Sequence, residues 1–345
     1  MANCNLTPAA VDRRHLLVGC AVTLLGVAAT SAAWAQGRRF RIAFANQNED
    51  PSIRLDGLGF TGVDVRRSFE LAARTMPVDM IYYDNAGDGE KALANADDAI
   101  ERKVELFIGY NADLEANAEI GRRLRAAGIR ALAVNYPIPG APLYTADNLA
   151  AGDIAGRALG EFARQNWSGQ SVVAVIVGDL GDVRTVVADR VQGIVEGLQR
   201  ELPDVTPTRL DTSGNPVRVE GLLGKFLRAQ SGRKVLVAAL DDATALAAKT
   251  AIEIAGRLGE CIIVSHGVDR SVHGGASDKK ELDPNNRGSI LLGSVAFFLD
   301  RYGYEVLPIA LRTLAGEQVP LRTATKHILV TGKNVFQIYP PFDMN

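Results

Sequence analysis

The chain has 345 residues with 38 Lys or Arg and 40 Asp or Glu, so its formal net charge at pH 7 is −2. This slightly acidic balance argues against nucleic acid or an anionic membrane surface as a general partner. The length exceeds what one hydrophobic core usually serves, and we therefore expect two domains.

The N-terminal segment predicts export. Arg13-Arg14 precedes an apolar run, Leu16–Ala33, which ends in the small-residue pattern Ala33-Trp34-Ala35. A basic start, an apolar middle and an A-x-A end are typical of a cleavable signal peptide, here residues 1–35, and the arginine pair resembles a loose twin-arginine signal. The alternatives are an uncleaved anchor, because about 18 apolar residues can span a bilayer, and a lipoprotein acylated at Cys20. We expect a periplasmic protein.

After residue 38, short apolar runs alternate with amphipathic stretches. Most runs are continuously apolar, as expected for parallel strands covered on both faces. The stretches between them are long enough for crossover helices, so the sequence predicts an α/β fold whose ligands bind at the carboxyl ends of the strands. The predicted strands are Arg41–Ala45, Val78–Asp84, Leu106–Asn111, Ile129–Tyr136, Val172–Asp179, Val235–Leu240, Cys261–Gly267 and Ser289–Phe297.

Two halves of the chain repeat this pattern, each with about four β-α units. Among the predicted crossover helices, Asp147 or Asn148 can cap Leu149–Gln165, and Asp242 can cap Ala243–Arg257. Two similar lobes joined by short connections create a cleft, and clefts between domains are common ligand sites.

Six short segments carry a family resemblance through their order and spacing. They are Thr145–Asn148, Ala188–Gly193, Asp241–Ala247, Ser265–Gly267, Arg287–Asp300 and Leu314–Glu317. In this order they resemble the type I periplasmic sugar-binding proteins, the ribose- and galactose-binding group that shares its fold with the lactose-repressor ligand domain. No helix-turn-helix precedes the core and an export signal does, so the repressor branch is disfavoured.

The resemblance implies two Rossmann-like, doubly wound parallel-sheet lobes joined by a hinge with three crossings. The crossings are expected near Ala146, Phe297 and Lys326. The N-terminal lobe would contain residues 38–146 and 298–326, and the C-terminal lobe residues 147–297 and 327–345.

The same resemblance implies where a ligand is held. Arg190 matches the family's arginine, whose forked guanidinium can bind adjacent hydroxyls, and we expect its loss to weaken binding with little effect on the unliganded protein's Tm. Asp241 is either a ligand residue or a helix N-cap. His266 and Phe297 replace polar family residues; alternatively, His266 is only hydrogen-bonded to the backbone and Phe297 is ordinary core. Because these replacements reduce polarity, a modified or less polar sugar fits better than ribose. The candidate ligand-binding residues are Phe60, Asn135, Tyr136, Arg190, Asp241, His266 and Phe297.

Enzyme signatures are missing from the sequence. The first predicted strand is followed by Asn46-Gln47-Asn48 rather than by the glycines of a dinucleotide-binding turn, and neither a P-loop nor G-x-S-x-G occurs. The histidines His266, His273 and His327 form no spaced metal pair. We therefore expect no catalytic residues, no cofactor and no metal.

Two functions stay open at this point. The first is a monomeric receptor that captures a small sugar-like ligand and delivers it to an ABC transporter permease. The second is a receptor of the same fold that presents its ligand to a membrane sensor or chemoreceptor. Nothing in the sequence separates them.

Overall fold

The computed structural model describes residues 37–181, 186–274 and 279–341. The predicted signal peptide, residues 1–35, lies outside these ranges. Within them, no helix combines the length and the apolar character that a membrane crossing requires.

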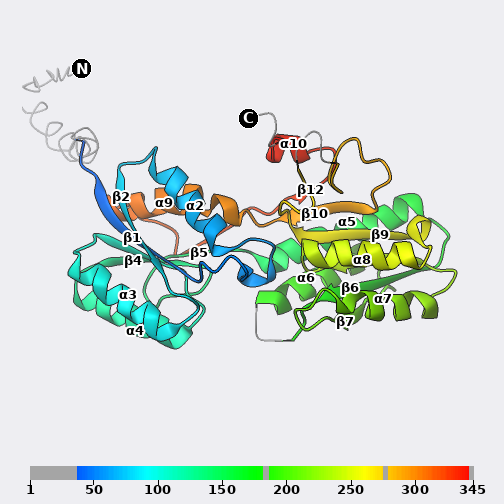
Figure 1. Cartoon of the computed structure of the whole chain (residues 1–345), viewed down its shortest axis with the longest axis horizontal. Helices are drawn as coiled ribbons and strands as arrows, with labels where there is room; N and C mark the ends of the chain where they lie inside the picture. The colour runs from blue at the N-terminus through cyan, green and yellow to red at the C-terminus, as the bar shows by residue number, and fades with distance from the viewer. Residues whose placement is uncertain (1–36, 182–185, 275–278, 342–345) are drawn as a thin grey trace, which may run out of the picture.

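The described residues form two lobes, each built on a six-stranded sheet (Figure 1). The strand order is β11-β5-β4-β3-β1-β2 in the first sheet and β12-β10-β9-β8-β6-β7 in the second. Neighbouring strands are parallel, except that β12 runs antiparallel to β10. The first sheet contains β1 Phe40–Asn46, β2 Val78–Asp84, β3 Leu106–Gly109, β4 Arg130–Val134, β5 Leu143–Thr145 and β11 Arg322–Ala324. The second contains β6 Val172–Gly178, β7 Thr208–Asp211, β8 Lys234–Ala239, β9 Cys261–Gly267, β10 Leu291–Ala296 and β12 Leu329–Val330.

Pairs of helices pack beside each sheet. In the first lobe α2 lies against α9 and α3 against α4, whereas in the second α5 lies against α6 and α7 against α8 (Figure 1). The helices are α2 Gly62–Ala73, α3 Gly89–Glu101, α4 Leu114–Ala126, α5 Asn148–Asn166, α6 Val186–Glu201, α7 Arg218–Ala229, α8 Asp242–Ile254, α9 Tyr302–Leu314 and the short α10 Val335–Ile338. In the described part of the chain, the 3-10 turns are η2 Leu55–Gly57, η3 Leu258–Glu260 and η4 Leu299–Arg301.

The predicted fold class is confirmed. Both sheets follow one plan, since the order β5-β4-β3-β1-β2 in the first lobe corresponds to β10-β9-β8-β6-β7 in the second. The chain passes from one sheet to the other after β5, after β10 and after β11. All eight predicted strands are present, with ends displaced by at most a few residues.

Two helix starts settle alternatives that the sequence left open. Asp147 caps α5 by accepting a hydrogen bond from the Ala150 amide. The prediction that Asp242 caps the helix after β8 is wrong, because Asp241 is the N-cap and Asp242 is the first helical residue. Asp241 is the N-cap because its backbone is extended and its carboxylate accepts a hydrogen bond of 2.7 Å from the Thr244 amide.

Candidate functional site

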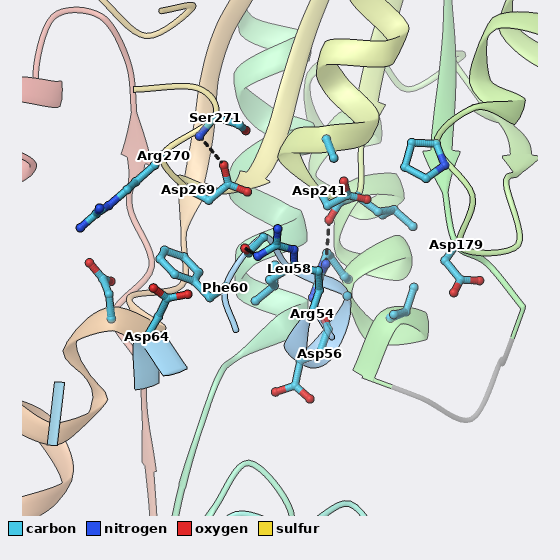
Figure 2. Close-up of a pocket in the computed structure, with 18 of the residues that line it drawn as sticks. Arg54, Asp56, Leu58, Phe60, Asp64, Asp179, Asp241, Asp269, Arg270 and Ser271 are labelled. Carbon is cyan, nitrogen blue, oxygen red and sulfur yellow. Dashed lines mark hydrogen bonds between the residues drawn. The ribbon is translucent and has the colours of Figure 1, made fainter. Parts of the chain in front are cut away.

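A cleft of about 1010 Å³ lies between the two lobes, where the β1–α2 loop meets the segments that follow β8 and β9. Figure 2 shows this loop entering the cleft opposite Asp241 and Asp269 of the second lobe. Among the described lining residues, aspartates outnumber arginines by six to four. These are Asp56, Asp64, Asp179, Asp241, Asp269 and Asp300, and Arg54, Arg67, Arg190 and Arg270.

The loop from Arg54 to Phe60 folds into a compact turn at the centre of the cleft. The Leu55 amide donates to the Phe60 carbonyl at 2.9 Å and closes the turn. At its tip, Asp56 and Gly57 have φ values of +53° and +65°, in the left-handed region. Gly59 presses against the second lobe, because a Cβ there would lie 1.4 Å from the Asp269 Oδ2 atom.

Apolar side chains anchor this loop. Leu55, Leu58 and Phe60 expose only 0%, 2% and 6% of their surface and belong to the core that continues into both lobes. Burying three such side chains stabilises the loop by about 4 to 9 kcal/mol, comparable with the binding free energy of about 8 kcal/mol that gives micromolar affinity. The loop is therefore a lasting part of the cleft wall.

Three side chains that follow β3 and β4 in the first lobe donate to the carboxylate of Asp56. The Tyr136 hydroxyl donates to its Oδ1 atom at 2.6 Å. The Asn135 side-chain amide donates to Oδ2 at 2.6 Å, and the Tyr110 hydroxyl donates to the same oxygen at 2.5 Å. Burial, together with the negative charge of Asp56, raises the pKa of both tyrosines well above the usual value, so they remain donors at neutral pH.

Arg190 of α6 is fully buried at the second-lobe side of the same loop. Its Nε and Nη2 atoms donate to Asn148 Oδ1 at 3.1 and 2.9 Å, and Nη1 donates to the Leu240 carbonyl at 2.8 Å. A longer bond of 3.3 Å joins Nη2 to the Asp56 carbonyl. The guanidinium also lies over the Phe297 ring, 4.7 Å from its centre. Burial lowers the pKa of Arg190 to about 10, which leaves it charged at neutral pH.

Asp241 and Asp242 occupy adjacent positions with different partners. Both oxygens of Asp241 accept from Thr244, through its amide and its hydroxyl. Asp242 is fully buried and accepts from the hydroxyls of Ser265 and Ser294. Burial and the nearby Asp269 carboxylate raise the pKa of Asp242 above its usual value. Asp241 therefore faces the cleft, while Asp242 ties α8 to β9 and β10.

His266 and Phe297 lie behind the cleft wall, since both are fully buried and neither lines the cleft. The Nδ1 atom of His266 is 2.9 Å from the Ala239 carbonyl. Burial and the charge of Arg190 lower the pKa of His266 to about 3, so the ring is neutral at physiological pH. Phe297 packs between Arg190 and the ring of His327.

The structure thus divides the seven predicted residues into two sets. Phe60, Tyr136, Arg190 and Asp241 line the cleft, whereas Asn135, His266 and Phe297 support that wall from behind. Sequence reasoning missed Asp56 and its partner Tyr110. The available signal was the long segment between β1 and α2, residues 47–61. The path of this loop into the cleft depends on the burial of Leu55, Leu58 and Phe60, and no known sequence motif predicts that burial.

No group of three or more His, Cys, Asp or Glu side chains in the described part of the chain could hold a metal ion. The cleft instead offers hydroxyl, carboxylate and guanidinium groups beside aromatic rings. Such a lining suits a polar organic molecule of modest size.

Two α/β lobes around a lined cleft define the class of two-lobed ligand-binding proteins. Residues 60–280 match a family described as the periplasmic binding protein domain, and the chain belongs to this family. A search among curated proteins finds no significant sequence match.

Solved structures share the fold over nearly their whole length. The glucose-galactose binding protein GanP from Geobacillus stearothermophilus is 18% identical, with a TM-score of 0.62 and coverage of 86% of this chain and 99% of that one. A periplasmic solute-binding protein of an ABC transporter from Actinobacillus succinogenes 130z, with bound D-allose, is 16% identical, with a TM-score of 0.66 and coverage of 87% and 100%. A solute-binding protein from Bacillus halodurans C-125 with bound myo-inositol is 18% identical, with a TM-score of 0.61 and coverage of 88% and 98%. The fold is therefore that of the type I periplasmic binding proteins.

Proposed function

We propose that this protein is an exported receptor that captures a neutral sugar, polyol or less polar sugar derivative between its lobes and delivers it to an ABC transporter permease. One observation carries the proposal: the cleft between the lobes brings together four of the residues predicted to bind a ligand, Phe60, Tyr136, Arg190 and Asp241. The sugars and polyols bound by structural neighbours support the same class of ligand. An excess of aspartates over arginines in the lining disfavours an anionic ligand.

In this proposal each lining residue has a distinct task. The rings of Phe60 and Tyr136 face the apolar side of the ligand, and Asp241 accepts from its hydroxyl groups. Arg190 fixes the second-lobe wall and contributes its charge to the cleft. Asn135, His266 and Phe297 act indirectly by holding Tyr136 and Arg190 in position. The protein is a receptor rather than an enzyme, and it works as a monomer without metal or cofactor.

We also propose the lobe boundaries and the route of export. The N-terminal lobe comprises residues 38–146 and 298–326, and the C-terminal lobe comprises residues 147–297 and 327–345. Residues 1–35 are removed as a signal peptide during transport to the periplasm. Mass spectrometry of the exported protein should find a chain that starts near Gln36, and an intact Leu16–Ala33 segment would contradict this.

A thermal-shift screen of the mature protein tests the proposed ligand class. D-allose, myo-inositol, allitol and glycerol are the first probes, with glucuronate as the anionic counterpart. A ligand that binds only the native state stabilises it by RT ln(1 + [L]/Kd), about 2.7 kcal/mol at 100 times Kd. We expect a saturable rise in Tm with at least one neutral polyol and none with glucuronate. No shift with any sugar, polyol or aromatic glycoside at millimolar concentration would reject the proposal.

A further inference from the structure

The centre of the cleft already contains a ligand-like group that belongs to the chain itself. Three of the residues expected to hold a sugar, Asn135, Tyr136 and Arg190, all bind Asp56 instead. Tyr110 adds a third donor to the Asp56 carboxylate. A carboxylate with two oxygens and several acceptor positions satisfies these donors as the hydroxyls of a bound sugar would.

The loop is built to stay in place. Leu55, Leu58 and Phe60 are buried on either side of Asp56, so withdrawal of the carboxylate would expose all three. Gly59 fits against Asp269 of the second lobe with no room for a side chain. Removal of this loop would consume most of the binding free energy of a micromolar ligand, about 8 kcal/mol.

We propose that Asp56 is a specificity-determining residue that permanently occupies the polar subsite formed by Tyr110, Asn135 and Tyr136. This inference rests on the proposed function, because it deepens the account of the same cleft. The external ligand then meets the rings of Phe60 and Tyr136 and the outer charged residues, and it gains nothing from the donors that Asp56 saturates. The ligand class is accordingly one with fewer hydroxyls, or with substituted hydroxyls, on its first-lobe side.

Chemical rescue by a free carboxylate tests the occupancy directly. Asp56→Gly removes the carboxylate and tolerates the positive φ at this position. Sodium acetate should raise the Tm of this variant by several degrees more than sodium chloride at equal ionic strength, and the wild-type protein should respond equally to both salts. Asp179→Gly is the matched control, because Asp179 lines the same cleft and, among the residues that the structure describes, its side chain accepts from the nearby Gly181 amide. It should show no acetate-specific rise.

Sugar binding provides the second measurement. Calorimetry with D-allose and myo-inositol should show at least tenfold tighter binding to Asp56→Gly than to the wild type, because three donors become available. Leu58→Ala loosens the loop without touching the carboxylate, and it should also bind these sugars at least tenfold more tightly. This second variant keeps the test usable if Asp56→Gly does not fold.

Each outcome decides the matter. Acetate rescue without binding of any sugar to the wild type would remove the proposed function and leave the occupancy of the subsite intact. A folded Asp56→Gly variant with no acetate-specific stabilisation would overturn the inference. So would a sugar-bound wild-type structure in which the ligand contacts Tyr110 and Asn135 while Asp56 lies elsewhere, although that result would support the proposed function.

Discussion

Arg190 places a positive charge inside the molecule, and its guanidinium donates hydrogen bonds to other residues of the protein. The sequence predicted a ligand-binding arginine whose loss leaves the unliganded protein stable. Full burial changes that expectation, because removal of the guanidinium leaves the carbonyl of Leu240 and the side-chain oxygen of Asn148 without their donor. The residue is therefore as important for the fold as for the cleft.

We predict that Arg190→Ala lowers the free energy of unfolding by about 3 kcal/mol or more, the cost of leaving buried polar partners unpaired. Urea unfolding of the unliganded protein measures this. Arg200→Ala is the matched control on the same helix, because its bond to Asp153 is solvent-exposed and should be worth less than about 1 kcal/mol. Equal stability of the two variants would contradict the structural role of Arg190.

His266 provides a prediction of pH dependence. Its pKa is about 3 in the folded protein because of burial and the charge of Arg190, compared with an ordinary value of 6.5. Because the unfolded chain binds the proton more readily, His266 contributes stability above pH 6.5 that is lost as the pH falls toward 3. The loss approaches about 1.4 kcal/mol for each pH unit below 6.5. In His266→Asn, the difference in unfolding free energy between pH 7 and pH 5 should be smaller than in the wild type; an unchanged difference would contradict the assignment.

For single residues, the sequence predicts the position along a strand but not the direction in which the side chain points. The end of a strand can be located in the sequence. Asn135, Asp241 and Phe297 follow β4, β8 and β10, and His266 lies near the end of β9. Whether such a side chain faces the cleft or the core depends on its rotamer and its neighbours. For this reason His266 and Phe297 could not be separated from Tyr136 and Asp241 in advance.

At the scale of elements, buried strands were predictable and edge strands were not. β9 is buried along its whole length and begins in the sequence with the apolar run Cys261–Val264. β7, Thr208–Asp211, is an exposed edge strand, and no apolar run marks its position in the sequence. The short strands β5, β11 and β12 have two or three residues each, too few for a period to emerge.

The α5–α6 pair depends on glycines that let two backbones meet. A Cβ at Gly156 would lie 2.2 Å from the Ile194 carbonyl oxygen, and one at Gly152 would lie 2.1 Å from the Arg190 carbonyl oxygen. This close approach sets the position of α6 and therefore of the Arg190 side chain. Overpacking of this kind usually costs about 1 to 3 kcal/mol.

We predict that Gly156→Ala destabilises the protein by about 2 kcal/mol or more, because helix backbones cannot give way as flexible side chains can. Gly221→Ala in α7 is the matched control: a Cβ there meets nothing within 4 Å. Removal of a mid-helix glycine should stabilise the protein by about 0.5 to 1 kcal/mol. Denaturant unfolding of both variants gives the two values, and the same sign for both would refute the argument from close packing.

At the scale of the whole molecule, two lobes are joined by three passages of the chain, after β5, β10 and β11. A cleft of about 1010 Å³ lies between them. That volume is at the upper end of the range of roughly 300–1,000 Å³ typical of small-ligand pockets, which usually bury most of the ligand surface. A monosaccharide in the cleft as it stands would leave much of its surface in water.

We therefore predict that ligand binding rotates the lobes toward each other about the three passages. The closed arrangement is favoured if it brings Phe60 of the first lobe and Asp241 of the second closer to the ligand at the same time, because the ligand shifts the population by its differential affinity for the two states. Small-angle scattering should show a smaller radius of gyration with a saturating polyol than without it. A non-binding polyol at the same concentration is the control for solvent contrast. Binding confirmed by calorimetry with an unchanged radius would mean that the loop around Asp56, which already touches both lobes, holds the two lobes at a fixed angle.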